Sequence, residues 1–314
     1  MYPPAKTAPS YDRLFAKKDI FFTTFGSLLY LLISSLLTGL RTDHLSLVII
    51  FNLLYFLSFS TRKLIMGFSV YIVYWIVFDY MKAFPNYLYN TVHIESLYKA
   101  EKNLFGIFYD NQLLTPNEYW LLHTNLFLDV ISGLFYLCWI PLPLAFSAYL
   151  FFKKREQFMQ LALTFFLVNI LGFVVYYAYP AAAPWYVQEY GFNFHASTPG
   201  NTAGLHRFDA FFNIPVFHVL YAKSSNVFAA MPSLHSAYPA IVLYYGLKNK
   251  LGWVNIIFAV IAAGIWFAAI YTSHHYILDV LAGILCATTG IFIFQKWLVT
   301  NKYIYNFFFK KLIS

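Results

Sequence analysis

The chain has 314 residues, of which 60% are hydrophobic, 22% aromatic and only 11% charged. A soluble globular domain carries about twice that share of charged residues, so the composition excludes an ordinary soluble fold and predicts an integral membrane protein. The formal net charge is +8, which is typical of nucleic-acid-binding proteins and of membrane proteins with basic cytoplasmic loops. Cys138 and Cys286 lie in separate apolar runs, so we expect neither a disulfide framework nor a structural zinc site.

Apolar runs near the length that crosses a bilayer, about 20 residues, recur along the chain. They predict an all-α fold, a polytopic membrane helix bundle of about eight transmembrane helices. No boundary between soluble domains is apparent, so residues 1–314 are predicted to form a single integral membrane domain. The run at 46–61 gives the weakest prediction, because it is short and has Ser58 and Ser60 near its end. The expected spans are residues 20–40, 46–61, 64–81, 125–152, 158–179, 233–247, 251–271 and 275–298.

The distribution of Lys and Arg predicts the orientation of these spans. With a cytoplasmic N-terminus, fifteen of the 21 basic residues lie on the cytoplasmic side and six on the other side. Topology therefore explains the positive charge, and no nucleic-acid partner is expected. Segments 82–124 and 180–232 and the turn at 271–275 then share the non-cytoplasmic side. The short termini favour a bacterial cytoplasmic membrane, although a Golgi membrane with a lumenal site has the same topology.

Two polar clusters interrupt the apolar runs on that side. "PSLHS" at 232–236 places His235 at the start of a predicted span, and "YTSHHYILDVLAG" at 271–283 holds the second cluster. His275 and Asp279 are four residues apart, so on a helix they share a face, where a carboxylate fixes the tautomer of an imidazole and raises its basicity. Charge at that depth is expensive and normally marks a function or a buried pair. We therefore predict three catalytic residues: His275 as the nucleophile, His235 as the general acid/base and Asp279 as the supporting carboxylate.

Simpler explanations exist for several of these polar residues. A lone histidine at a helix end is often solvated, and a serine such as Ser233 is often only a cap. His274 is expected to point away from its neighbour on a helix, and to orient it or contact solvent. Aromatic residues at 176–194 are typical of a membrane-interface belt, with a barrier against water as the alternative.

A third polar cluster, at 181–209, contains Arg207 and Asp209. The planar fork of an arginine suits a phosphate, but a surface pair between Arg207 and Asp209 fits the spacing equally well. Asp129 lies about one turn into an apolar run and needs a partner. It either helps to position a substrate or forms a structural pair with a threonine or asparagine.

Four motifs, in the order "APWY", "PGNTAGLHRFD", "MPSLHS" and "SHHYILD", resemble those of the inositol phosphorylceramide synthases, a branch of the type 2 phosphatidic acid phosphatase superfamily. The resemblance covers residues 79–285 and implies a six-helix phosphatase-type core. In that family the histidine before tyrosine in the last motif is the nucleophile, which maps to His275, and its carboxylate maps to Asp279. The general acid/base histidine of "MPSLHS" maps to His235.

The chain departs from the superfamily pattern at two phosphate ligands. The lysine that precedes Arg-Pro is not found ahead of "PSLHS", and Ala269 stands where an arginine is expected. Both losses also occur in the ceramide phosphotransferase branch. We expect Arg207 to bind the phosphate, helped by the backbone amides around Ser233 and Leu234. Lys82 is a further phosphate candidate.

The resemblance implies a phosphotransferase that moves inositol phosphate from phosphatidylinositol to ceramide through a phosphohistidine and releases diacylglycerol. Its partners are then a phospholipid donor and a ceramide acceptor, with Asp129 as a candidate ligand for the inositol ring or the acceptor. Neither a metal nor a cofactor is required, because imidazole is already a nucleophile at neutral pH. The nearest alternative is a lipid phosphate phosphatase with water as acceptor. Others are a proton-relaying transporter and a zinc site built from His235, His274, His275 and Asp279.

Overall fold

The computed structural model describes residues 14–196, 198–222, 226–301 and 303, and apart from one short hairpin its regular elements are helices. Five of the described helices are long and apolar enough to cross a membrane, or six if the bent pair α6 and α7 is one span. The predicted all-α multi-pass fold is confirmed. All eight predicted spans fall on helices, but α2 (Thr42–Leu57) and α12 (Leu234–Lys248) have only 16 and 15 residues, so the number of crossings stays a prediction.

The predicted span at 125–152 is in fact two helices, α6 (Leu126–Leu137) and α7 (Pro141–Lys153), with a bend of 40° between them. Pro141 is the first residue of α7. A proline has no N–H to donate and its ring clashes with the carbonyl four residues earlier, so it ends the preceding helix and begins a new one. Hydropathy alone does not detect this break because both halves are apolar.

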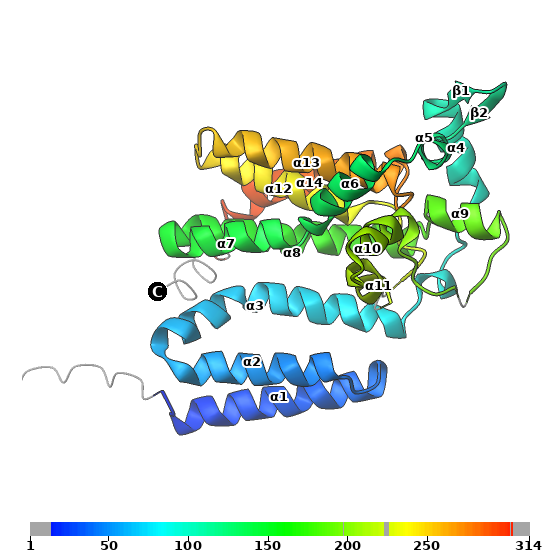
Figure 1. Cartoon of the computed structure of the whole chain (residues 1–314). Coiled ribbons are helices and arrows are strands. Elements are labelled where there is room, and N and C mark those ends of the chain that lie inside the picture. Colours follow the sequence, from blue (N-terminus) through cyan, green and yellow to red (C-terminus); the bar gives the residue numbers. More distant parts are fainter. Residues whose placement is uncertain (1–13, 197, 223–225, 302, 304–314) are drawn as a thin grey trace, which may run out of the picture. The chain divides into compact units, whose positions relative to one another are not determined.

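The chain divides into two compact units, Met1–Ala83 and Phe84–Ser314, and the single domain expected from the sequence stays a prediction. In the N-terminal unit, α1 (Lys17–Leu37), α2 and α3 (Phe59–Tyr80) run side by side (Figure 1). Ser58 separates α2 from α3 because its hydroxyl accepts the Thr61 N–H and caps α3.

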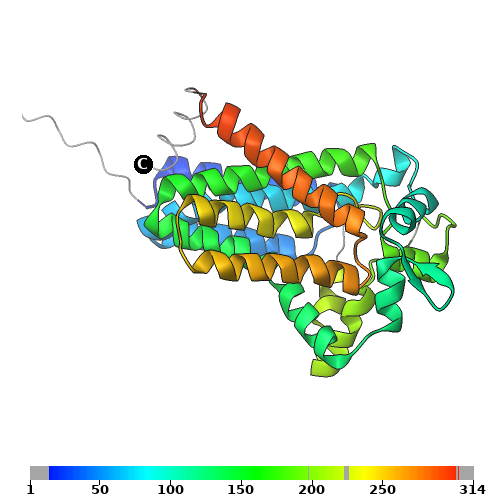
Figure 2. The same cartoon turned by 90° about the horizontal axis from the view of Figure 1, so that it is seen from above.

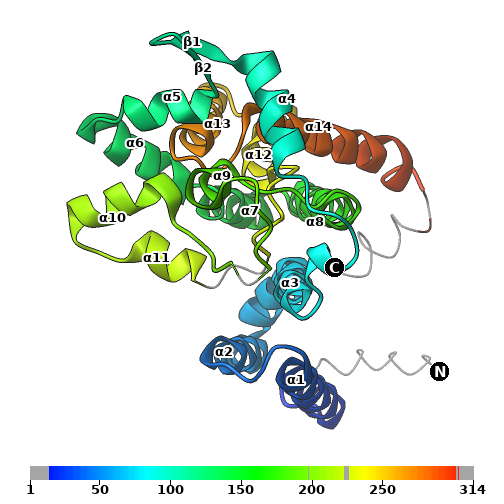
Figure 3. The same cartoon turned by 90° about the vertical axis from the view of Figure 1, so that its right-hand side faces the viewer.

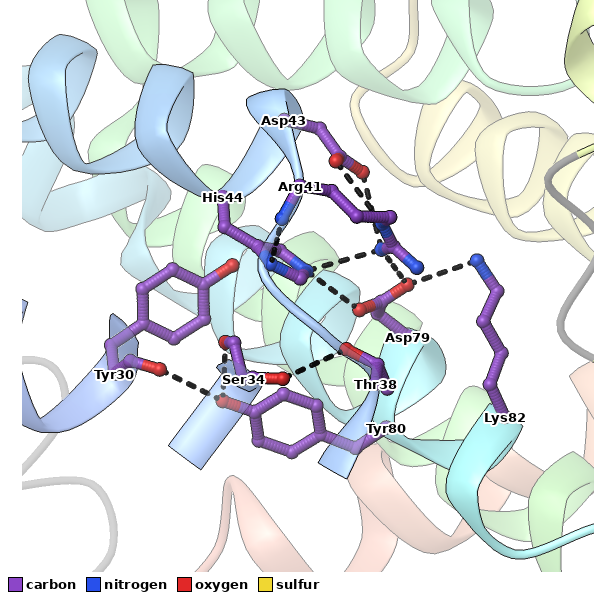
Figure 4. Close-up of polar contacts among 9 residues, drawn as sticks. All are labelled: Tyr30, Ser34, Thr38, Arg41, Asp43, His44, Asp79, Tyr80 and Lys82. Carbon is purple, nitrogen blue, oxygen red and sulfur yellow. Dashed lines mark hydrogen bonds and ion pairs between the residues drawn. The ribbon is translucent and has the colours of Figure 1, made fainter. Parts of the chain in front are cut away.

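The N-terminal unit contains a cluster of charged side chains around Asp79, which we call the Asp79 cluster (Figure 4). The Asp79 carboxylate is bound by Arg41 Nη2 at 2.6 Å, by His44 Nε2 at 3.1 Å and by Lys82 Nζ at 3.1 Å. Arg41 also binds Asp43. Because an isolated carboxylate at the end of an apolar helix is costly, these partners explain how α3 holds an aspartate that is only 5% exposed.

In the C-terminal unit, α8 (Arg155–Ala178), α12, α13 (Val254–Tyr271) and α14 (Ile277–Ile293) pack together with α6 and α7 as a helix bundle (Figure 2). The non-spanning segments gather at one end of these helices, as the end-on view shows (Figure 3). At this end α12 and α14 begin and α13 stops, so the loops of the bundle meet the short elements there. These elements are α4 (Glu95–Phe105), β1 (Ile107–Tyr109), β2 (Gln112–Leu114), α5 (Pro116–Leu122), α9 (Pro184–Tyr190), α10 (His206–Phe212) and α11 (Val216–Tyr221).

Candidate active site

The loop at 272–276 joins α13 to α14 and carries His274 and His275. Our prediction of a helical His275 is wrong, because α14 begins only at Ile277. Ser273 has a φ of 59°, a region that non-glycine residues seldom occupy. The loop therefore depends on contacts from other segments to keep its shape.

Three segments distant in sequence hold this loop. The Trp185 N–H donates to the Ser273 carbonyl at 3.0 Å, and the Gly204 N–H donates to the Thr272 carbonyl at 2.9 Å. The buried Asn117 Nδ2 donates to the carbonyls of Ile270 and His275, at 2.8 and 2.9 Å. These bonds fix the backbone on both sides of the two histidines.

A fourth contact fixes the beginning of α14. The carboxylate of Glu101, from α4, is fully buried and accepts the Ile277 and Leu278 N–H groups at 2.9 and 3.1 Å. The first amides of a helix have no partner within the helix, and a negative charge there is favourable. Burial raises the pKa of the Glu101 carboxyl to about 7.

The structure brings His235 and His275 together. His235 lies in the first turn of α12, and its Nδ1 is 3.0 Å from Nε2 of His275, forty residues later in the chain. Tyr136 Oη also lies 3.2 Å from His235 Nδ1. Since only one of the two facing ring nitrogens can carry the shared proton, one histidine presents a lone pair to the other.

Asp279 stands behind His275, on the far side of the ring from His235. Its carboxylate is fully buried, accepts the Tyr276 N–H at 2.8 Å and has Oδ2 3.6 Å from His275 Nδ1. That distance is within ion-pair range but longer than a hydrogen bond. A carboxylate in this position would stabilise a positive charge on the His275 ring.

Close contact between α12 and α14 makes the pairing of the histidines possible. The Ser233 N–H donates to the Asp279 carbonyl at 2.9 Å. A Cβ added to Gly283 would lie 2.1 Å from the Ser233 carbonyl oxygen, so glycine is needed at this approach. Ser233 also caps α12, since its Oγ accepts the Ser236 N–H. The Ser233 amide, one of the predicted phosphate donors, is thus already bonded to Asp279. The Leu234 amide, the other predicted donor, is in the first turn of α12, where amides have no partner inside the helix.

The buried position of His275 determines its protonation. The residue is 5% exposed, and burial lowers the pKa of its imidazole to about 4. The ring is therefore neutral at pH 7, which is the state that an imidazole nucleophile requires.

A cavity of about 90 Å³ adjoins the three histidines, and most of its lining comes from residues 183–230. Of the two roles expected for His274, orientation of its neighbour or contact with solvent, the second is wrong, because this residue is 4% exposed and lines the cavity together with His235 and His275. Trp185 and Tyr186 are buried in the protein, so for these two the aromatic-belt interpretation is also wrong. The complete lining is Ala183, Trp185, Gly200, Asn201, Tyr221, Asn226, Val227, Ala229, Ala230, His235, His274 and His275.

Arg207 and Asp129, predicted separately as substrate ligands, bind each other. Arg207 Nε lies 2.5 Å from Asp129 Oδ1, which also accepts the Tyr271 hydroxyl at 2.8 Å. The alternative pair of Arg207 with Asp209 is wrong, since the Asp209 carboxylate accepts backbone amides at the start of α11. Neither Arg207 nor Asp129 lines the cavity. Arg207 Nη2 has no hydrogen-bond partner among the described residues, so its role as a phosphate ligand stays a prediction.

Lys82 belongs to the Asp79 cluster of the N-terminal unit, where its Nζ binds Asp79 (Figure 4). Its phosphate-binding role also stays a prediction. Within the described residues, no group of three or more His, Cys, Asp or Glu side chains is arranged to hold a metal ion, so the zinc alternative gains no support from geometry.

Sequence reasoning missed the residues that support the site. Glu101 and Asn117 act on the histidine loop from more than 150 positions away. Tyr136 lies within an apolar span whose sequence gives no sign of a polar role. The available signal for Glu101 was its place in the amphipathic stretch at 95–105. The sequence does not say that this glutamate is buried or which helix it caps.

Comparison with known proteins identifies the relatives of this chain. A family model described as the PAP2 superfamily matches residues 106–293. A phosphoinositol dihydroceramide synthase from Bacteroides thetaiotaomicron is 43% identical over 295 residues, which cover 93% of this chain and 97% of that protein. The inositol phosphorylceramide synthase catalytic subunit of Saccharomyces cerevisiae is 27% identical over 74% of this chain and 59% of its own length. The inositol phosphorylceramide synthase of Candida albicans is 27% identical over 55% of this chain and 39% of its own. No solved structure matches the chain.

Proposed function

The chain belongs to the PAP2 superfamily, and from this premise we propose that it moves inositol phosphate from phosphatidylinositol to the hydroxyl of a ceramide or dihydroceramide, releasing diacylglycerol. The observation that carries the proposal is the 3.0 Å contact between His235 and His275 at the wall of a cavity, with Asp279 behind it. The Bacteroides relative, a phosphoinositol dihydroceramide synthase that matches nearly the whole of this chain, supports the choice of substrates.

In the first half-reaction, His275 Nε2 attacks the phosphorus of phosphatidylinositol. Its lone pair forms the N–P bond while the P–O bond to diacylglycerol breaks, and the hydrogen on Nδ1 faces Asp279. His235, which carries a proton on both nitrogens beside the phosphate anion, gives one proton to the departing diacylglycerol oxygen. The result is inositol phosphate bound to His275, a neutral His235 and free diacylglycerol.

In the second half-reaction the acceptor hydroxyl replaces diacylglycerol. The neutral His235 takes the hydroxyl proton as its oxygen attacks the phosphorus, and the N–P bond to His275 breaks. Both histidines thereby return to their starting states. The buried Asp279 carboxylate stabilises the positive charge on the phosphorylated ring in between.

Exclusion of water distinguishes this transferase from the phosphatase alternative. Trp185 lines the cavity, and Tyr186 belongs with it to one buried hydrophobic cluster; both residues lie in α9. We expect these aromatic residues to keep the phosphohistidine from hydrolysis until the acceptor arrives. The phosphate charge is expected to be met by first-turn amides of α12 and by Arg207, after Arg207 is freed from Asp129.

The test is product identification by mass spectrometry after the purified protein is incubated with phosphatidylinositol, with and without ceramide and dihydroceramide. We expect an inositol phosphorylceramide product and little release of inositol phosphate without acceptor. His275→Ala should lower transfer by at least about 10³-fold, and His218→Ala, at an exposed position outside the cavity, is the matched control. Acceptor-independent release of inositol phosphate at the full rate would make the protein a phosphatase instead.

The orientation of the cavity stays part of the proposal. The charge distribution predicts that α4, α5 and α9 lie on the non-cytoplasmic side of a bacterial membrane. A single cysteine at the exposed hairpin residue Asp110 should react with an impermeant maleimide in intact cells. Labelling only after the membrane is opened would reverse the assignment.

A further inference from the structure

The cavity beside the catalytic histidines contains two buried polar atoms that the proposed chemistry does not use. They are Nε2 of His274 and Nδ2 of Asn226, and neither has a hydrogen-bond partner in the described parts of the chain. A buried polar atom without a partner destabilises a protein by about 1–3 kcal/mol, so such atoms are few in folded proteins. At the wall of a substrate cavity they mark positions where a ligand supplies the missing bonds.

The tautomer of His274 follows from its neighbours. The Thr272 hydroxyl donates its only hydrogen to the Ala268 carbonyl at 2.6 Å. His274 Nδ1 lies 3.0 Å from the same Thr272 oxygen, so Nδ1 carries the hydrogen and donates it. Burial lowers the pKa of His274, and the nearby imidazoles lower it further. The ring is neutral, and its Nε2 presents a lone pair that accepts a hydrogen bond.

The amide of Asn226 has the opposite character. Its Oδ1 accepts the Phe228 N–H at 3.3 Å, which leaves the Nδ2 group as the donor without a partner. The cavity wall therefore offers one acceptor and one donor. Tyr221 packs against the His274 ring with centroids 4.6 Å apart, and Tyr136 lies at 5.3 Å, so the ring is held in place.

This pair of atoms selects the chemistry of its ligand. A phosphate oxygen only accepts hydrogen bonds and would face the His274 lone pair unfavourably. An ammonium group only donates and would leave Asn226 unsatisfied. A hydroxyl both donates and accepts, and neighbouring hydroxyls of a polyol can bind both atoms at once.

We propose that His274 and Asn226 form the subsite for the polyol head group of the phospholipid donor, and that they determine its specificity. This inference rests on the proposed function and names the part of the site that recognises the donor. His274 is then a binding residue for a substrate hydroxyl, distinct from the phosphorus chemistry of its neighbour His275. The hydroxyls of the ceramide acceptor can form the same hydrogen bonds as those of the donor head group. The experiment therefore varies donor and acceptor separately to show which of the two binds at this subsite.

The first experiment compares donors and acceptors in wild type, His274→Leu, His274→Gln and Asn226→Leu. We expect His274→Leu to lower kcat/KM for phosphatidylinositol by about 10–100-fold, mainly through KM, because the substrate hydroxyl loses its partner. The loss should be smaller for phosphatidylglycerol, which has fewer hydroxyls, while the KM for ceramide is unchanged. His274→Gln retains an acceptor and should recover part of the activity.

An equal loss with both donors, or a change confined to the ceramide KM, would overturn the inference while leaving the transferase proposal intact. A merely structural role for His274 would lower kcat for every substrate and would not change the ratio between donors.

A binding experiment makes the inference independent of turnover. Glycerophosphoinositol, a soluble head-group probe, should raise the Tm of wild type and of the inactive His275→Asn variant but not that of His274→Leu or Asn226→Leu. If the wild-type protein binds the probe in this way but shows no transfer activity, the proposed function is refuted and the subsite remains. Equal stabilisation of all four proteins by the probe would refute the subsite.

Discussion

The Asp79 cluster and the histidine cavity are both buried and polar, but they differ in how completely their atoms are paired. The side chains of Arg41, His44 and Lys82 all bind the Asp79 carboxylate. The Arg41 backbone N–H donates to His44 Nδ1 at 3.3 Å, so the other ring nitrogen of His44, Nε2, is the donor to Asp79. None of these side chains is among the buried atoms of the described chain without a partner.

The histidine cavity shows the reverse. Among the residues that line it, His274 Nε2, His275 Nδ1 and Asn226 Nδ2 are buried without partners in the described chain, and so is Oδ1 of Asp279 behind His275. Since a satisfied network stabilises and specifies a fold whereas a partly satisfied one is costly, the fold retains the second cluster for another reason. In this chain, completeness of pairing, more than burial or charge, distinguishes the Asp79 cluster from the site that we propose to be reactive.

The largest effect is expected from Asp279→Asn. The amide cannot stabilise a positive His275, so transfer should fall by about 10³–10⁴-fold, as when a triad aspartate is lost, with the KM for phosphatidylinositol little changed. Initial rates of labelled inositol phosphate transfer measure it. Asp110→Asn, at an exposed turn where asparagine is tolerated, is the control. If Asp279→Asn stays active, the incomplete pairing of this carboxylate has no catalytic meaning.

Gly283→Ala tests the geometry of the same site with a single methyl group. The new Cβ would push α14 away from Ser233 and separate His235 from His275, which should lower kcat by about 10-fold and destabilise the fold by about 1–3 kcal/mol. Gly26→Ala is the matched control, because nothing lies within 4 Å of a Cβ at that position of α1, and it should be neutral or stabilising by up to about 1 kcal/mol. Similar behaviour of the two variants would show that the close contact has no role.

Asp79→Asn tests the structural side of the comparison. Removal of the carboxylate leaves Arg41 and Lys82 without their shared partner, and since both are partly exposed, we expect a loss of about 1–3 kcal/mol. Transfer per folded molecule should change by less than about 5-fold. Thermal unfolding in detergent and activity per folded protein measure the two quantities. A large loss of activity with unchanged Tm would assign this cluster to the reaction.

The smallest effect is a pH dependence from Glu101. Its pKa rises from 4.5 to about 7 on folding, so between these values the folded state binds more protons and the contribution of Glu101 to stability decreases as pH rises. The Tm of wild type should therefore exceed that of Glu101→Gln by more at pH 5 than at pH 8, by a few degrees. A difference that is constant or larger at pH 8 would contradict the assignment.

The sequence predicted the features that depend on local chemistry. Runs of apolar residues identified the helices, and the high cost of polar groups in lipid identified His235, His275 and Asp279. What it did not predict depends on contacts distant in the chain. The pair of Arg207 with Asp129 joins positions 78 apart, and the conformation of the loop at 272–276 depends on hydrogen bonds from α5, α9 and the residues before α10. Spacing along one helix cannot reveal either.

The central claim is most directly tested by trapping the covalent intermediate. The purified protein is mixed with phosphatidylinositol in the absence of acceptor, quenched in alkali to preserve phosphohistidine and analysed by peptide mass spectrometry. We predict an inositol phosphate adduct on His275 that disappears when ceramide is added before the quench and that is absent from His275→Ala. Transfer that proceeds in a single turnover without any adduct, or with the adduct on another residue, would contradict the account.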